Sequence, residues 1–135
     1  MIIAVDFDGT IVEHAYPKIG REKPFAISTL KKLQQDGHHQ LVLWTVREGD
    51  LLREAVEFCK QRGLEFYAVN SNYPEELPEH RASRKISADL FIDDCNLGGI
   101  PDWGIIYRQI MSGDIRKPYS NEEPQPPSLW KKLFG

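Results

Sequence analysis

Acidic side chains stand directly after two apolar segments of this 135-residue chain. Asp6 and Asp8 follow IIAV at the start of the chain, and Asp93 and Asp94 follow LFI much later. If the two segments are neighbouring parallel strands, the four carboxylates meet at the edge where open α/β sheets bind ligands. Neighbouring carboxylates repel one another, and a hard divalent cation with oxygen ligands removes that conflict. The spacing therefore predicts a cation site, with Mg²⁺ the usual ion where phosphate is bound.

Hydroxyl and cationic side chains are expected at the same edge of the sheet. Thr45 and Arg47 follow a further apolar segment, LVLW, and Lys85 stands shortly before LFI. Positive groups beside a cation site suit an anionic substrate. Arg84, next to Lys85, could hold a second anionic group of that substrate. Together these side chains predict an anionic substrate.

The elements that must position these groups alternate along the chain. Continuous apolar runs predict strands buried on both faces, and segments with apolar residues at i, i+3, i+4 and i+7 predict helices between them. This alternation is typical of parallel βαβ units, and hence of an α/β sheet with helices on both faces. Residues 103–111 fit either a short helix or an edge strand. The strands are expected at Ile2–Val5, Leu41–Trp44, Phe66–Val69 and Leu90–Ile92, and the helices around 26–33 and 50–59.

Length and composition indicate one folded domain followed by a tail. The composition is ordinary for a globular protein, with 41% hydrophobic and 27% charged residues. We expect a catalytic domain over residues 1–113 and a proline-rich tail over residues 114–135. The apolar end of the tail, around Leu129 and Trp130, could dock on this domain or on a second copy in a homo-oligomer.

Several classes of protein are disfavoured by the same composition. No apolar run reaches the 18 or more residues of a membrane span, and the N-terminal segment lacks the basic start of a signal peptide. Cys59 and Cys95 have no metal-binding or disulfide-framework spacing, which favours reduced thiols and a cytoplasmic location. A net charge of −3 does not favour nucleic acid as a partner.

The order of these motifs resembles the haloacid dehalogenase superfamily of phosphotransferases. The first motif of that family, DxDGT after a buried strand, is matched by residues 6–10. Its second motif, a Ser or Thr after a strand, is matched by Thr45, and its third, a lysine, by Lys85. Its fourth, an acidic pair after a strand, is matched by Asp93 and Asp94. The five-residue first motif is fairly specific, whereas the second and third alone would be weak.

The resemblance implies a Rossmann-like parallel sheet in the order 3-2-1-4 and a role for each matched residue. Asp6 would be the nucleophile that forms an aspartyl-phosphate. Asp8 would protonate the leaving oxygen and then activate water. Thr45 would donate its hydroxyl to a phosphoryl oxygen, and Lys85 would neutralise the phosphoryl group.

The family pattern also implies a Mg²⁺ ion and several substrate contacts. Mg²⁺ would bind the side chain of Asp6, the backbone carbonyl of Asp8 and one acid of the last pair. Asp94 is the direct ligand in this reading, while Asp93 acts through water or orients Lys85. Gly9 permits the tight turn after the first motif. Further contacts to substrate are assigned to four residues, namely Gly9, Thr10, Arg47 and Arg84.

Two features narrow the reaction within that family. An Asp at position 8 suits phosphate-ester hydrolysis, because the departing alkoxide needs a proton. The gaps of 34 residues between Thr10 and Thr45 and of 39 between Thr45 and Lys85 leave no room for an inserted cap domain. The expected protein is a capless phosphatase acting on a phosphorylated small molecule. A connecting flap, residues 11–23, carries His14, which could reach that substrate.

Two other functions stay open at this stage. The protein could be a phosphate- or nucleotide-binding interaction module with little turnover, which the tail would suit. It could also process nucleic-acid ends as a phosphatase, but only the basic residues near Lys85 support that reading. The complete motif set favours hydrolysis, because a pure binding module has no need of Asp8.

Overall fold

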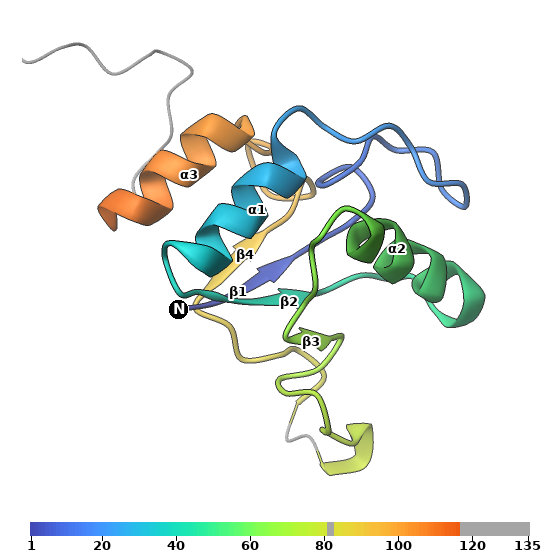
Figure 1. Cartoon of the computed structure of the whole chain (residues 1–135). Coiled ribbons are helices and arrows are strands. Elements are labelled where there is room, and N and C mark those ends of the chain that lie inside the picture. Colours follow the sequence, from blue (N-terminus) through green and yellow to red (C-terminus); the bar gives the residue numbers. More distant parts are fainter. Residues whose placement is uncertain (81–82, 117–135) are drawn as a thin grey trace, which may run out of the picture.

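A four-stranded parallel sheet organises the chain, in the order β3-β2-β1-β4 (Figure 1). The computed structural model describes residues 1–80 and 83–116. This arrangement confirms the α/β class and the strand order predicted from the sequence. The strands are β1 (Ile2–Val5), β2 (Gln40–Leu43), β3 (Ala68–Val69) and β4 (Leu90–Ile92). In the part of the chain that is described, no helix has the length and apolar character needed to cross a bilayer.

Three α-helices and one short 3₁₀ helix connect and follow the strands. The segment that fitted either a helix or an edge strand is a helix. Asp102 caps it, since its side chain accepts a hydrogen bond from the backbone N–H of Ile105 (3.0 Å), and Gly113 ends it at φ 82°. The elements are α1 (Ala26–Gln35), α2 (Gly49–Gln61), η1 (Pro78–His80) and α3 (Trp103–Ser112).

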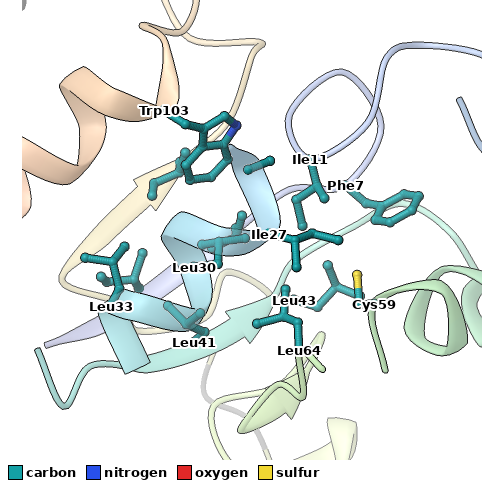
Figure 2. Close-up of a cluster of buried hydrophobic side chains, with 14 of the residues drawn as sticks. Phe7, Ile11, Ile27, Leu30, Leu33, Leu41, Leu43, Cys59, Leu64 and Trp103 are labelled. Carbon is teal, nitrogen blue, oxygen red and sulfur yellow. The ribbon is translucent and has the colours of Figure 1, made fainter. Parts of the chain in front are cut away.

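The main core lies on one face of the sheet, beneath all three α-helices. Alternate residues of β1 point to opposite faces, so Ile3 and Val5 contact this core while Ala4 faces the other way. Figure 2 shows Leu30 and Leu33 of α1 above the sheet, with Trp103 of α3 packed at one end. The core therefore joins every helix to the two central strands.

The prediction of helices on both faces needs a correction. In the described part of the chain, α1, α2 and α3 all contribute to the same core, and Ile86 of the β3–β4 connection packs on the other face. The steps from β1 to β2 and from β2 to β3 move in one direction across the sheet. Right-handed crossovers therefore place α1 and α2 on the same side. The chain returns to β4 across the opposite face, and among the described residues of this connection the three of η1 are in helical form.

Several element boundaries differ from the sequence prediction. β2 begins and ends one residue earlier than the expected Leu41–Trp44. β3 is confined to Ala68–Val69, two residues shorter at its start than expected. Asp50 is not the N-cap of α2, because Gly49 at φ 55° already begins the helix after an extended Glu48. Asp50 instead lies in the first turn, where a negative charge favours the helix N-terminus. The predicted docking of the apolar tail end falls on residues outside the described part of the chain.

Candidate functional site

The predicted acids meet at the carboxyl edge of the sheet. Asp6 follows β1, and its backbone N–H donates a hydrogen bond to the carbonyl of Ile92 in β4 (3.0 Å). This bond ties the end of β1 to the strand that carries the acidic pair. A hollow of about 300 Å³ opens there, lined by Asp6, Asp8, His14, Trp44, Thr45, Val46, Asp93 and Cys95. A larger hollow of about 1040 Å³ lies beside α2, but none of the four acids lines it. We therefore identify the candidate site by its acidic residues and not by the volume of the hollow.

Asp6 carries the most perturbed carboxyl group of the site. Burial raises its pKa to about 7, and the negative charges of Asp93 and Asp94 add to that increase, although a hydrogen bond from the backbone of Phe7 opposes it. Oxygen atoms of Asp93 and Asp94 and the sulfur of Cys95 lie within 4.8 Å of one another. Carboxylate oxygens of Asp93 and Asp94 are of the type that binds hard cations, whereas the Cys95 thiol suits softer metals, so the group is a candidate cation site that specifies no particular ion.

Thr10 holds the acidic pair in place. Its hydroxyl oxygen accepts a hydrogen bond from the Asp94 backbone N–H (3.1 Å), and the hydroxyl donates to Asp94 Oδ1 (3.2 Å). The indole N–H of Trp103 donates to the Thr10 carbonyl (3.1 Å). Thr10 is 0% exposed and does not line the hollow, so a contact with substrate stays a prediction. Its side chain holds Asp94 in position through these two hydrogen bonds.

The pKa of Asp94 reflects that support. Burial acts to raise it, but the hydrogen bond from Thr10, a hydrogen bond with Asp6 and the charge of His14 together hold it below its ordinary value. The pKa values of Asp6 and Asp94 are therefore shifted in opposite directions, although both carboxyl groups lie at the same edge of the sheet. The opposite directions of the two pKa shifts favour the proton on Asp6 and the ionised form of Asp94.

Replacing Thr10 with valine should destabilise the fold by about 1–2 kcal/mol, since Asp94 loses both hydrogen bonds in a partly buried place. Urea unfolding in EDTA would measure the loss. Thr29→Val is the matched control, because Thr29 is also buried but lies on α1 away from the acids. An equal loss of stability in both variants would contradict the role assigned to Thr10.

Gly9 makes room for the acid that Thr10 supports. Its φ of 82° is the left-handed conformation predicted for a tight turn. A Cβ at this position would overlap Asp94 Oδ2 and stand 2.7 Å from Cδ2 of His14. The residue is thus needed for the close approach of two side chains, and a contact with substrate stays a prediction.

The flap carries His14 to the acids. Residues 11–23 fold back on themselves, with the Glu13 N–H donating to the Arg21 carbonyl (2.8 Å) and Val12 bridging Glu22. His14 Nε2 lies 3.3 Å from Asp94 Oδ2, and its side chain is 64% exposed. The structure therefore places this histidine at the mouth of the hollow.

Thr45 is poised to donate its hydroxyl hydrogen. Its Oγ1 accepts a hydrogen bond from the Arg47 backbone N–H (3.1 Å), which leaves the hydroxyl hydrogen available for an oxygen in the hollow. The Thr45 backbone N–H donates to Asn70 Oδ1 (2.8 Å). Asn70 was not among the predicted site residues. Its place directly after the third apolar segment, at the same sheet edge, was the available signal.

Arg47, which is also predicted to contact substrate, lies among buried partners. It is 0% exposed, and its Nε and Nη2 donate to the two carboxylate oxygens of Asp8 at 2.7 Å each. The hydrogen bond with Asp8 raises the pKa of Arg47, although burial opposes the increase. The guanidinium is directed into the protein and not into the hollow, so it does not contact substrate in this arrangement.

Lys85 and Arg84 lie outside the hollow, on the exposed β3–β4 connection. Lys85 Nζ is 4.9 Å from the centroid of the Phe91 ring. Among the described residues, no ion pair within 4.0 Å joins Lys85 to any of the four acids. Phe91 lies within β4, whereas Asp93 follows its end, and Lys85 is not among the residues that line the hollow. Its catalytic role stays a prediction.

Comparison with known proteins gives one informative relative. No protein-family model and no curated protein matches the sequence. A solved structure, that of a conserved protein coded by a locus from Bacteroides thetaiotaomicron, superimposes with a TM-score of 0.78. The two sequences are 63% identical over 87% of this chain and 98% of the other, and the description of that protein states no activity. At that identity and coverage, this chain belongs to the same family as the conserved Bacteroides protein.

Proposed function

We propose that this protein is a Mg²⁺-dependent phosphomonoester hydrolase that works through an aspartyl-phosphate on Asp6. One observation carries the proposal: a partly buried Asp6 with a raised pKa borders the same hollow as Asp93, Asp8 and Thr45. A carboxylate crowded by other acids is costly to maintain without a catalytic or ion-binding purpose. The motif order of the haloacid dehalogenase superfamily supports the same conclusion.

The residues of the site divide the work of two half-reactions. Asp6 attacks phosphorus, the bond to the ester oxygen breaks, and that oxygen leaves with a proton from Asp8. Water then attacks the phosphorus of the aspartyl-phosphate and gives a proton to Asp8. The bond between phosphorus and the Asp6 oxygen breaks, which releases phosphate and restores Asp6. The pairing of Asp8 with Arg47 in the free protein corresponds to the ionised form needed in the second half. Thr45 donates to a phosphoryl oxygen throughout.

The family motifs imply which of the acids would bind the metal directly. Asp6, Asp94 and the backbone carbonyl of Asp8 would be the direct ligands, with Asp93 beside them. When bound, Mg²⁺ supplies positive charge for Asp6 and for the phosphoryl oxygens. The hollow of about 300 Å³ would accept the phosphate group of a phosphorylated small molecule. The free Cys59 and Cys95 suit a reducing, cytoplasmic location.

Release of phosphate from an aryl phosphate, with Mg²⁺ or with EDTA, tests the proposal. We expect turnover with Mg²⁺ and at least about a 100-fold loss in EDTA, because the transition-state charge is then uncompensated. Turnover that resists EDTA would contradict the metal assignment. If there is no turnover, Mg²⁺-dependent binding of fluoroberyllate would favour the phosphate-binding module, and no binding would reject a phosphate site altogether.

A further inference from the structure

Arg47 makes more contacts than its pairing with Asp8 requires. Its Nη1 donates to the backbone carbonyls of Pro17 (3.2 Å) and Leu51 (3.3 Å), and its Nη2 also donates to the carbonyl of Lys18 (3.0 Å). With the two bonds to Asp8, these contacts occupy all five N–H groups of a guanidinium. A single side chain thus connects Asp8, two carbonyls of the flap and the first turn of α2.

Aromatic rings fix the plane of the guanidinium. The centroids of the Phe7 and Tyr16 rings each lie 5.2 Å from the central carbon of Arg47. Tyr16 belongs to the flap and is 52% exposed. The flap therefore contacts Arg47 through a ring as well as through two carbonyls, and a shift of the flap changes the position of the guanidinium.

Asp8 keeps acceptor capacity while it is held. Each of its oxygens accepts one N–H from Arg47, and a carboxylate offers about four acceptor sites. Asp8 also borders the hollow, so its remaining sites are available to a substrate oxygen or a water there. A carboxylate held at both oxygens has little freedom to rotate, which is what a proton-transfer group needs.

We infer that Arg47 is a positioning residue through which the flap sets the orientation of the proton-transferring Asp8. The inference rests on the proposed phosphatase function, and it adds that the geometry of Asp8 depends on the flap. Because Arg47 does not touch substrate, its effect should appear in the chemical steps and not in substrate binding. This separates it from a residue that binds the phosphate.

Arg47→Lys tests the role, since it keeps the charge and removes the planar fork. We expect kcat to fall about 10–100-fold for an alkyl phosphate, which needs a proton on its leaving oxygen, and only a few-fold for a nitrophenyl phosphate. KM should stay within about twofold. In an Asp8→Asn background, Arg47→Lys should change kcat by less than about twofold, because the group it positions is absent. Equal loss on both substrates, or additive losses, would overturn the inference.

Arg53→Lys is the matched control, an Arg to Lys change on α2 at a side chain that is 74% exposed. It should leave both substrates unaffected. If Arg47→Lys fails to fold, Tyr16→Leu removes the flap ring from the guanidinium and should give the same dependence on leaving group, with a smaller loss. A uniform loss in Tyr16→Leu would overturn the inference.

Hydrogen exchange tests the coupling without any turnover. The Asp8→Asn substitution should speed exchange of the flap amides of Glu13 and Lys23, whose bonds to Arg21 and Ile11 close the flap. Arg47 joins the Asp8 carboxylate to the flap carbonyls of Pro17 and Lys18. The substitution keeps the backbone bond from Gly9 to Val12, so we expect the effect to pass through the Arg47 side chain. Unchanged exchange would overturn the coupling even in an active enzyme. Faster flap exchange in Asp8→Asn, together with no phosphate release by the wild type, would support the coupling and reject the proposed function.

Discussion

Replacing Asp6 with asparagine should abolish phosphate release and, at the same time, stabilise the metal-free protein above pH 7. Activity should fall at least about 1000-fold, because the amide cannot form the phosphoenzyme. The gain in stability follows from the raised pKa of Asp6, which burial and the charges of Asp93 and Asp94 bring to about 7. An ionised Asp6 is unfavourable in the folded site, and asparagine removes that charge.

The sign of the pH dependence follows from proton binding. Between about pH 4 and pH 7, the folded protein holds a proton on Asp6 that the unfolded chain has already released. Stability of the metal-free wild type therefore decreases as the pH rises through this range, and the full penalty is present above pH 7. After allowance for solvent screening of a partly exposed group, the advantage of Asp6→Asn at pH 8 should be about 1–2 kcal/mol.

Urea unfolding in EDTA at pH 8 and at pH 4 would measure this difference. The advantage of the variant should shrink as the pH falls through 7 and vanish near pH 4. Added Mg²⁺ should favour the wild type instead, since a ligand stabilises the form that binds it. If Asp6→Asn is less stable than the wild type at pH 8 in EDTA, burial and the charges of Asp93 and Asp94 do not destabilise an ionised Asp6 as we expect.

Replacing Arg47 with leucine should cost about 3–5 kcal/mol of stability. Asp8 is only 7% exposed, and without Arg47 its charge has no partner in a buried place. The carbonyls of Pro17, Lys18 and Leu51 lose a donor as well. Removal of one member of a buried ion pair is far more costly than the net contribution of the pair itself.

A double variant separates the charge from the packing. Adding Asp8→Asn to Arg47→Leu should recover part of the lost stability, because no uncompensated charge is then buried. Arg53→Leu is the control: this exposed arginine pairs with Asp50 on the surface of α2, and its loss should change stability by less than about 0.5 kcal/mol. Equal unfolding of Arg47→Leu and Arg53→Leu would contradict the importance of the buried pair.

Residue order alone predicted a parallel sheet with acids at the carboxyl ends of two strands, whereas the strand order came from the family resemblance. Four apolar segments with helical segments between them leave few parallel arrangements, and a polar residue directly after a strand must lie at its carboxyl edge. With the first and last strands as neighbours, which the resemblance implied, Asp6 and Asp93 fall beside each other, and the structure brings both to one hollow. The period of two along β1 likewise determined that Ile3 and Val5 share a face.

Tertiary packing decided which way the remaining side chains point. Arg47 and Asp8 are 39 residues apart, and Thr10 and Asp94 are 84 apart, so no local pattern records either contact. The position of a residue in the sequence can place it at the edge of the sheet, but it does not determine the rotamer of its side chain. Here the rotamers of Thr10 and Arg47 are selected by their buried partners. For that reason, two residues expected to hold substrate instead hold the acids: Thr10 supports Asp94, and Arg47 fixes Asp8 against the flap.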